Sequence, residues 1–276
     1  MLFDKPIPFK EALESRAMKR ILPTAAKSAE IAKLGPQILT RSTFSAQMAE
    51  VGPLVRLDRL ITEMVSPISR TARGESVIDA GTFRLEMRKA LAEAGYTPPK
   101  GKEGGLLDHR SDRRLNLILK MNLDSAYGYG QHVQGQDPDI LDMWPCQELI
   151  RVESRKEERE WVDKWVRKGG SLYPKNGGRR MIARKDDSIW SAISRFGTPY
   201  PPFDYNSGMG LRDVRRKEAE DLGVIKRSDI IKPDETRLTD NVEAAFPKGI
   251  SSGLAEVLQQ VFKVVGDRII LEGVNA

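Results

Sequence analysis

The sequence predicts a mixed α+β protein, in which an all-helical N-terminal domain precedes a domain with a long leading helix and a small sheet. Before residue 97, apolar residues recur with helical periodicity. After residue 109, short runs of β-type residues alternate with helical segments, which is the pattern of an α+β domain. Between these parts lies TPPKGKEGGLLDH, whose two prolines and three glycines favour a linker. We therefore expect four parts: a helical domain (1–96), a linker (97–109), an α+β domain (110–226) and a C-terminal helix-strand extension (227–276).

Two stretches of the first domain contain helices that must be interrupted. Residues 7–34 have a helix-forming composition, but Pro23 must break or kink the helix because proline lacks a backbone donor and clashes with the preceding turn. Residues 38–69 carry two apolar stripes that are separated by Gly52 and Pro53, which predicts a sharp kink or two helices.

Two further helices have recognisable ends. Residues 82–94 form an amphipathic segment with Thr82 as its expected N-cap and Gly95 as its terminator. Its buried side is formed by Phe83, Met87 and Leu91. Ser111 or Asp112 can cap the long helix that leads the second domain. The buried side of that helix is formed by Leu115, Ile118, Leu119 and Leu123.

The second domain contains two strand-like runs with a helix between them. The runs are QELIRVE (147–153) and RRMIARK (179–185), and the helix lies in 157–170, where Trp161 and Trp165 share a buried face. A short helix at 213–222, ended by Gly223, follows later in the chain. The C-terminal extension adds a helix at 252–264 and the strand-like RIILEG.

The segment RFGTPYPPFDYNSGMGLRDV (195–214) predicts a rigid, irregular loop. Its prolines hold the chain extended, because each fixes its own φ and biases the preceding residue away from helix. Asp204 and Asn206 can close turns, and Gly208 and Gly210 can adopt positive φ. The rings that we expect to pin the loop, as architecture or as an interface, are those of Tyr200, Phe203 and Tyr205.

The composition indicates a globular, intracellular protein without a membrane segment. Of its 276 residues, 39% are hydrophobic and 30% are charged, which allows a buried core. No apolar run approaches the roughly 18 residues that a membrane helix needs, and the first residues lack the apolar core of a secretory signal. The single cysteine, Cys146, cannot form an intrachain disulfide.

The sequence predicts no metal site or bound cofactor. A structural zinc site needs four Cys or His ligands in close pairs, whereas this chain has only His109, His132 and Cys146. We expect the histidines to lie at the surface or at helix ends, and Cys146 to be a small buried side chain. Gly177 and Gly178 precede Arg179, a possible phosphate cradle, although a tight turn explains these glycines better.

No catalytic constellation is evident, so we expect a protein that is not an enzyme. No lysine has an acidic residue two positions before it, as a restriction-type nuclease strand would require. The nearest acidic pair, Asp186 and Asp187, suits the first turn of a helix. The many acids leave glycoside hydrolysis by paired carboxylates formally open.

The charge of the chain indicates at most weak contact with nucleic acid. The net charge is +6, and residues 1–100 hold 16 Lys and Arg against 11 Asp and Glu. Candidate phosphate or DNA contacts in the second domain are Arg179, Arg180, Arg184, Arg212, Arg215 and Arg216. Acidic residues interleave these clusters, among them Asp186, Asp187 and Asp213, so that only non-specific binding is expected.

Three segments together resemble the phage Mu F-like minor head proteins of the head-morphogenesis family. They are PIPFKEALESRAMKRILPT, RRLNLILKMNLDSAYGYGQHVQGQDPDILDMWP and FGTPYPPFDYNSGMGLRDVRRKEAEDLGVI, which span about residues 5–226. The family pattern in the long helix is matched by Arg114, Asn122, Ala126, Tyr127 and Gly130. Many members carry a central histidine and a later proline–asparagine–arginine–cysteine block, but residues 201–207 here contain neither residue type, so no site residue is carried over.

The resemblance implies a structural minor capsid protein of a tailed phage or prophage. It would bind portal, major capsid or scaffold proteins and aid head assembly or DNA packaging and delivery, with weak contact to packaged DNA. Its location would be the virion, in the capsid interior or portal region, after assembly in the host cytoplasm. The alternatives are a non-specific DNA-binding module and a toxin-like or hydrolytic enzyme domain.

Overall fold

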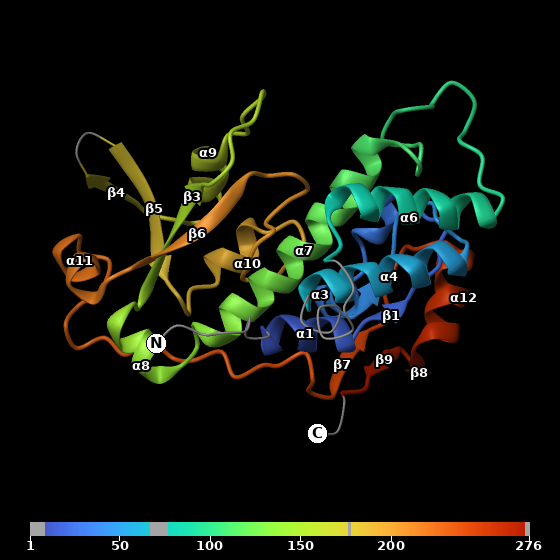
Figure 1. The fold of residues 1–276 in the computed structure, drawn as a ribbon. Helices are drawn as coiled ribbons and strands as arrows, with labels where there is room; N and C mark the ends of the chain where they lie inside the picture. Colours follow the sequence, from blue (N-terminus) through green and yellow to red (C-terminus); the bar gives the residue numbers. More distant parts are fainter. Residues whose placement is uncertain (1–8, 67–76, 176–177, 274–276) are drawn as a thin grey trace. The chain divides into compact units, whose positions relative to one another are not determined.

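The computed structural model describes residues 9–66, 77–175 and 178–273, which belong to two compact units (Figure 1). The first unit contains the chain up to Gly130 and again from Leu238 onward, and the second unit runs from Gln131 to Arg237. Helices and strands occur in both units, which confirms the predicted mixed α+β class.

The first unit combines helices with two small sheets. Its helices are α1 (Lys10–Ala17), α2 (Ser28–Ile31), α3 (Pro36–Thr40), α4 (Val51–Val65), α6 (Ala80–Glu93), most of α7 (Asp112–Gln134) and α12 (Ser252–Val261). Its strands are β1 (Arg20–Ile21), parallel to β2 (Ser42–Thr43), and the antiparallel set β7 (Val242–Ala245), β9 (Arg268–Leu271) and β8 (Lys263–Val265) in that spatial order.

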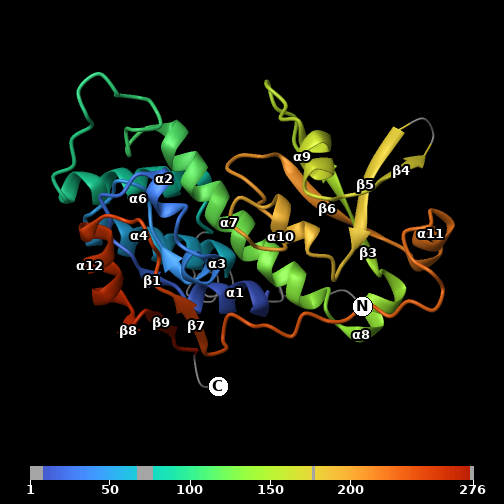
Figure 2. The ribbon, with the colours of Figure 1, turned by 180° about the vertical axis from the view of Figure 1, so that it is seen from behind.

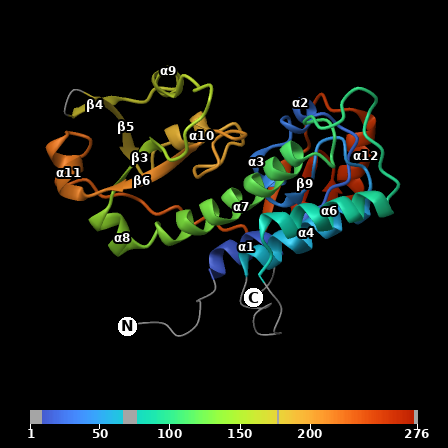
Figure 3. The same cartoon turned by 45° about the horizontal axis from the view of Figure 1, so that its top comes forward.

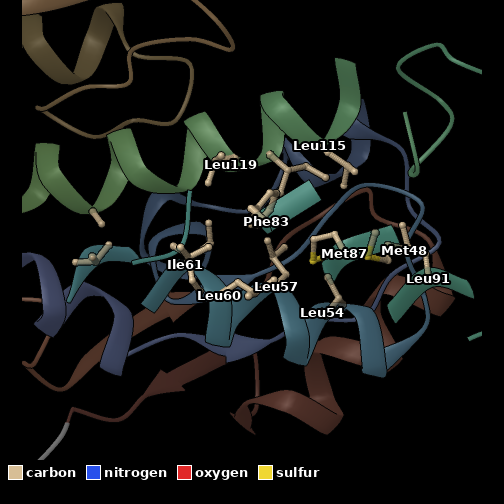
Figure 4. Close-up of a cluster of buried hydrophobic side chains, with 14 of the residues drawn as sticks. Met48, Leu54, Leu57, Leu60, Ile61, Phe83, Met87, Leu91, Leu115 and Leu119 are labelled. Carbon is tan, nitrogen blue, oxygen red and sulfur yellow. The ribbon is translucent and has the colours of Figure 1, made fainter. Parts of the chain in front are cut away.

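The larger core of the first unit lies between α4, α6 and α7. Figure 4 shows Leu57, Phe83 and Leu119 pointing toward one another from these three helices. The apolar periodicity of each segment produces this packing, because every helix buries the stripe that its sequence places on one face. The fully buried side chains here include Met48, Leu54, Leu57, Ile61, Phe83, Met87, Leu91 and Leu115.

A second core in the first unit joins segments from both ends of the chain. Helix α12 covers the sheet β7-β9-β8 (Figure 2), and Leu258 and Ile269 are fully buried there. Leu22 and Ile38, from the N-terminal part, belong to the same cluster and are also fully buried. The C-terminal extension from Leu238 onward is therefore part of the core of the first unit.

Helix α1 packs against α7 at residues of the second resembling segment. Phe9 stacks on Tyr127, with ring centroids 6.1 Å apart. A side chain at Gly130 would meet the Phe9 ring, because a Cβ there would lie 2.6 Å from Cζ of Phe9 and 3.0 Å from the backbone nitrogen of Ala12. Glycine at position 130 therefore permits the close approach of the two segments.

Replacing Gly130 should destabilise the protein although the position is helical. We expect Gly130→Ala to lower the free energy of unfolding by about 1–3 kcal/mol, because the overpacking against α1 exceeds the gain in helix propensity. Gly52→Ala in α4 is the matched control: a Cβ there has nothing within 4 Å, so that this variant should be as stable as wild type or more stable. Chemical denaturation measures both, and equal effects of the two changes would contradict the packing argument.

A buried group of charges lies between α1 and α4. Arg16 donates hydrogen bonds to Asp58 and, at 3.4 Å, to Oδ1 of Asn122. The pKa of Lys19 is lowered to about 7, because burial and the positive charge of Arg16 outweigh the attraction of Asp58, with a further contribution from Arg41. The proton on Lys19 is therefore held less tightly in the folded protein than in the unfolded chain.

The stability of the protein should consequently depend on Lys19 above neutral pH. Because the folded pKa lies below the ordinary value of 10.5, the unfolded chain binds more protons between these two values, and stability rises with pH across that window. We expect Lys19→Met to remove this rise. The variant should therefore be more stable than wild type at neutral pH, and the difference should shrink as the pH approaches about 10. Denaturation midpoints across the window, with the exposed Lys27→Met as control, test this, and parallel profiles for all three proteins would refute it.

The second unit is built around one antiparallel sheet (Figure 3). Its strands, in spatial order, are β4 (Leu172–Lys175), β5 (Gly178–Arg184), β3 (Cys146–Arg151) and β6 (Met209–Val214). Its helices are α8 (Pro138–Met143), α9 (Trp161–Arg167), α10 (Ile189–Ile193) and α11 (Arg216–Asp221). One apolar cluster joins the sheet to α9 and α10, and another joins it to α8 and α11, so that helices pack on both faces.

Most predicted elements of the second unit are present with shifted ends. The two strand-like runs form β3 and β5, and Trp161 and Trp165 of α9 are buried as predicted. The helix expected at 213–222 begins only at Arg216, because the preceding residues pair with β3 as strand β6. Gly223 ends it with a φ of +71°.

Several helix limits in the first unit differ from the prediction. Helix α1 ends at Ala17, before Pro23, because the following residues pair with β2. The N-cap of α6 is Asp79 rather than Thr82: the Asp79 carboxylate accepts a hydrogen bond from the backbone N–H of Thr82 at 2.7 Å. Gly95 is the terminator, as expected, with a φ of +70°. The predicted positions 7, 8 and 67–69 lie outside the described residues.

The structure divides the chain at other places than the sequence predicted. Residues 110–130 belong to the first unit, because α7 buries its apolar stripe against α4 and α6. The extension from Leu238 onward belongs there too. The end of the expected linker is buried: Asp108 and His109 are 6% and 4% exposed, and the backbone N–H of His109 donates to the Tyr96 hydroxyl at 3.0 Å.

Candidate interaction surface

Two of the predicted phosphate-binding arginines are held by a buried acid on the sheet. Glu148 of β3 accepts hydrogen bonds from Nε and Nη2 of Arg180, at 2.9 and 2.6 Å, and from Arg212. Arg180 also pairs with Glu218 of α11 at 2.8 Å. Burial alone would raise the pKa of Glu148, but the hydrogen bonds from Arg180 and Arg212 hold it below its ordinary value. The negative charge of Glu148 therefore offsets part of the positive charge of Arg180 and Arg212, which the sequence analysis proposed as phosphate contacts.

Two more of these arginines also have acidic partners. Arg184 forms a bidentate pair with Asp186 at 2.8 and 2.7 Å. Arg216 lies 3.0 Å from the carboxylate of Asp142 and donates to the backbone oxygens of Asp142 and Asp229. These ion pairs engage the groups that a phosphate would need.

The remaining two candidates, Arg179 and Arg215, are exposed on the second unit. Arg179 lies in β5 close to its first residue, Gly178, and the neighbouring Gly177, where a turn was predicted, lies outside the described residues. The six arginines therefore do not form one open basic face, because four of them are engaged by carboxylates within the fold.

A pocket of about 750 Å³ lies between α8, α11 and residues 227–233. Its apolar part includes Leu141 and Ile231, and its charged part includes Arg216, Lys217 and Glu220. Both signs of charge line it, so the lining does not select one class of ligand.

Two of the three rings expected to pin the loop between α10 and β6 (Figure 1) are buried, those of Tyr200 and Phe203. Phe203 is fully buried against Trp190, with ring centroids 6.3 Å apart, and Tyr200 is 6% exposed. Tyr205 is half-buried and contacts Phe196 edge-on at 5.0 Å. The loop therefore has an inner side that is fixed to the core and an outer side that carries Tyr205.

The backbone of this loop is also fixed. The N–H of Arg195 donates to the carbonyl of Phe203 at 2.8 Å, which closes the loop. Asn206 and Gly208 have φ values of 49° and 67°, the left-handed conformations expected of turn residues. Gly210 does not share this conformation: it lies in β6, where it pairs with Ile150 of β3.

The structure confirms the predicted burial of Cys146 but not the predicted exposure of His109. His109 is buried rather than exposed, and its Nε2 lies 3.1 Å from the carbonyl of Gln47. Cys146 is fully buried as expected, and burial raises its pKa to about 12. Within the described part of the chain, no group of three or more His, Cys, Asp or Glu could hold a metal ion.

His132 pairs with an acid that the sequence did not single out. Its Nε2 lies 3.2 Å from Oδ2 of Asp234, and its Nδ1 lies 3.5 Å from the amide of Gln136. The hydrogen bond to His132 lowers the pKa of Asp234 to about 2. Both ring nitrogens therefore have a protein partner. Only the fold reveals this pair, because Asp234 lies 102 positions later in the chain.

A second group that the sequence missed lies at the outer side of the loop. Arg159 and Arg195 both approach Asp204, at 2.9 and 3.9 Å. Lys164 of α9 lies 4.7 Å from the centre of the Trp161 ring. No sequence cluster predicted this group, because its members come from two segments that lie about 30 residues apart.

Comparison with protein-family models, with curated proteins and with solved structures found no match for this chain. Among the described residues, no helix has the length and apolar character that a membrane span requires.

Proposed function

We propose that this chain is a structural protein of a tailed-phage or prophage head, of the minor head-protein type. It would bind portal, capsid or scaffold proteins during head assembly or DNA packaging. The three resembling segments support this role, and two of them meet in the fold, where Phe9 and Ala12 pack against Gly130. The role is structural rather than catalytic.

The loop at residues 195–208 is the observation that carries the proposal. Its inner side is held by the buried Phe203 and by the Arg195–Phe203 hydrogen bond, so that its outer side is a preformed surface. A preformed surface loses little conformational entropy when a partner protein binds.

A DNA-binding module is supported less well. Four of the six arginines proposed for phosphate contact are engaged by acids within the second unit. A protein that relies on phosphate contacts needs such cations at its surface and loses affinity steeply as salt rises. We therefore propose only weak contact with packaged DNA.

An enzymatic role also receives little support from the histidines. The ring of His132 is engaged by Asp234 and Gln136, and that of His109 is buried against Tyr96, with centroids 5.1 Å apart. A general base needs a ring nitrogen within reach of a substrate proton. Neither ring offers such a nitrogen to a substrate in this fold.

The test is a titration of the purified chain with duplex DNA and with the portal protein of the same phage or prophage, each at two salt concentrations. We expect DNA binding with a Kd of roughly 10⁻⁴–10⁻⁶ M at physiological salt. The complex with portal protein should persist at moderate salt, because apolar and aromatic contacts would dominate it. Nanomolar affinity for DNA together with no portal complex would overturn the structural role in favour of the DNA-binding one.

A further inference from the structure

Four cations of the second unit gather at the outer side of the 195–208 loop. Arg159 lies two residues before the start of α9 and donates to the carbonyl of Tyr205 at 2.7 Å, and Arg195 lies over the Tyr205 ring at 5.3 Å. Lys164 of α9 lies close enough to both arginines to be affected by their charge. The members of this group, the loop cation cluster, are Arg159, Lys164, Lys168 and Arg195.

One carboxylate contacts this cluster. Asp204 lies 2.9 Å from Arg159 and 3.9 Å from Arg195, and its side chain is 17% exposed. Glu158 and Glu160 flank Arg159 in the sequence, but Glu158 pairs with Arg151 at 3.1 Å, and among the described residues no ion pair joins either glutamate to the four cations. In the described part of the chain, the four cations have one carboxylate, Asp204, within ion-pair distance. On the sheet, by contrast, Arg180 pairs with Glu148 and Glu218, and Arg212 pairs with Glu148.

Lys164 lies in the field of the other members of the cluster and of Asp204. Its pKa is lowered, first by burial and then by repulsion from Arg159, Lys168 and Arg195, against the attraction of Asp204. Positive groups that repel one another at a surface gain energy when a negatively charged partner approaches them.

The arginine head groups are both accessible and fixed. The side chains of Arg159 and Arg195 are 47% and 45% exposed, so that an incoming group can reach them. The carbonyl and ring of Tyr205 hold the two guanidinium groups in place. Planar guanidinium groups that are already oriented bind carboxylates with directed hydrogen bonds.

The Tyr205 ring beside the loop cation cluster is already in contact with two neighbouring side chains, which helps to distinguish between classes of partner. Phe196 packs edge-on against Tyr205, and Arg195 covers a face of the same ring. Proteins that bind single-stranded nucleic acid without sequence preference stack its bases on exposed aromatic rings that lie between cations. Here the ring is shared between Phe196 and Arg195, so the observations favour carboxylate groups over stacked bases.

We propose that the loop cation cluster is a docking site for an acidic segment of a partner protein. The inference rests on the proposed function only in that the partner is a protein. Asp204 occupies part of the cluster in the free chain and would compete with the acidic side chains of the partner. Loss of the Asp204 charge should therefore strengthen binding of the partner, whereas loss of one of the cations should weaken it.

The experiment measures binding of a fluorescent poly-L-glutamate peptide and of an oligothymidylate of equal charge by anisotropy at low and physiological salt. We expect the peptide to bind more tightly than the oligonucleotide. Arg195→Gln and Lys164→Gln should each weaken peptide binding about threefold, and Asp204→Asn should strengthen it about threefold. A threefold change corresponds to about 0.7 kcal/mol, which is within the range of an exposed ion pair. Arg184→Gln, which removes a cation already paired with Asp186, is the matched control and should change binding little.

Thermal unfolding of every variant checks that it is folded. The inference is overturned if the oligonucleotide binds more tightly than the peptide, or if Arg184→Gln weakens binding as much as Arg195→Gln. It is also overturned if Asp204→Asn weakens binding. Portal binding is measured separately, so that failure of the portal complex with the expected peptide pattern would count against the proposed function alone.

Discussion

Replacement of Glu148 by alanine should destabilise the second unit strongly. We expect the free energy of unfolding to fall by about 3–5 kcal/mol, because the variant leaves Arg180 as a buried cation without its main partner. The side chains of Glu148 and Arg180 are 7% and 10% exposed, so that water offsets little of the lost interaction. The remaining partner, Glu218, sits on α11 and is more exposed than Glu148.

Chemical denaturation followed by tryptophan fluorescence measures this change, since Trp161, Trp165 and Trp190 all belong to the sheet cluster of that unit. Glu158→Ala is the control, because Glu158 is 60% exposed in its pair with Arg151, and its loss should cost less than about 1 kcal/mol. Similar effects of the two substitutions would show that the buried pair contributes no more than a surface pair.

The same pair has a consequence for acid stability. The pKa of Glu148 lies below its ordinary value of 4.5 in the folded protein, so the unfolded chain binds the proton more readily. The contribution of Glu148 is therefore fully present above that ordinary value and is lost as the pH falls through the lowered pKa. Glu148→Ala should reduce the slope of stability against pH in this acid range.

Truncation of Phe203 should have the second large effect. We expect Phe203→Ala to lower the free energy of unfolding by about 3–5 kcal/mol, because the ring is fully buried against Trp190 and its loss leaves a cavity. The loop would also lose its anchor, so that the Arg195–Phe203 backbone hydrogen bond would become weaker.

Phe196→Ala in the same loop is the matched control, because Phe196 is only half-buried and contacts Tyr205. Its truncation should cost clearly less than that of Phe203. Thermal and chemical unfolding measure both variants. A Phe203→Ala variant as stable as wild type would mean that the loop is held by something other than this ring.

The predictions for the arginines show where the sequence reached its limit. The clusters around Arg179 and Arg212 are visible in the sequence, but their acidic partners lie far away along the chain. Arg180 is 32 positions from Glu148 and 38 from Glu218, and Arg212 is 64 positions from Glu148. Sheet register brings them together, since Glu148 stands opposite Arg212 in the β3–β6 ladder. A count of charges along the chain cannot show such cancellation.

The sequence by itself determined the class of the fold, the helices with strong periodicity and the anchored loop. These features are local: Phe83, Met87 and Leu91 recur at helical spacing, and the prolines and glycines of 195–208 restrict the backbone directly. Tertiary structure alone decided that the C-terminal extension completes the core of the first unit, that Glu148 holds two arginines and that Asp204 meets Arg159 and Arg195. The physical reason is that burial and charge pairing depend on distances between segments far apart in the chain, which local residue preferences do not encode.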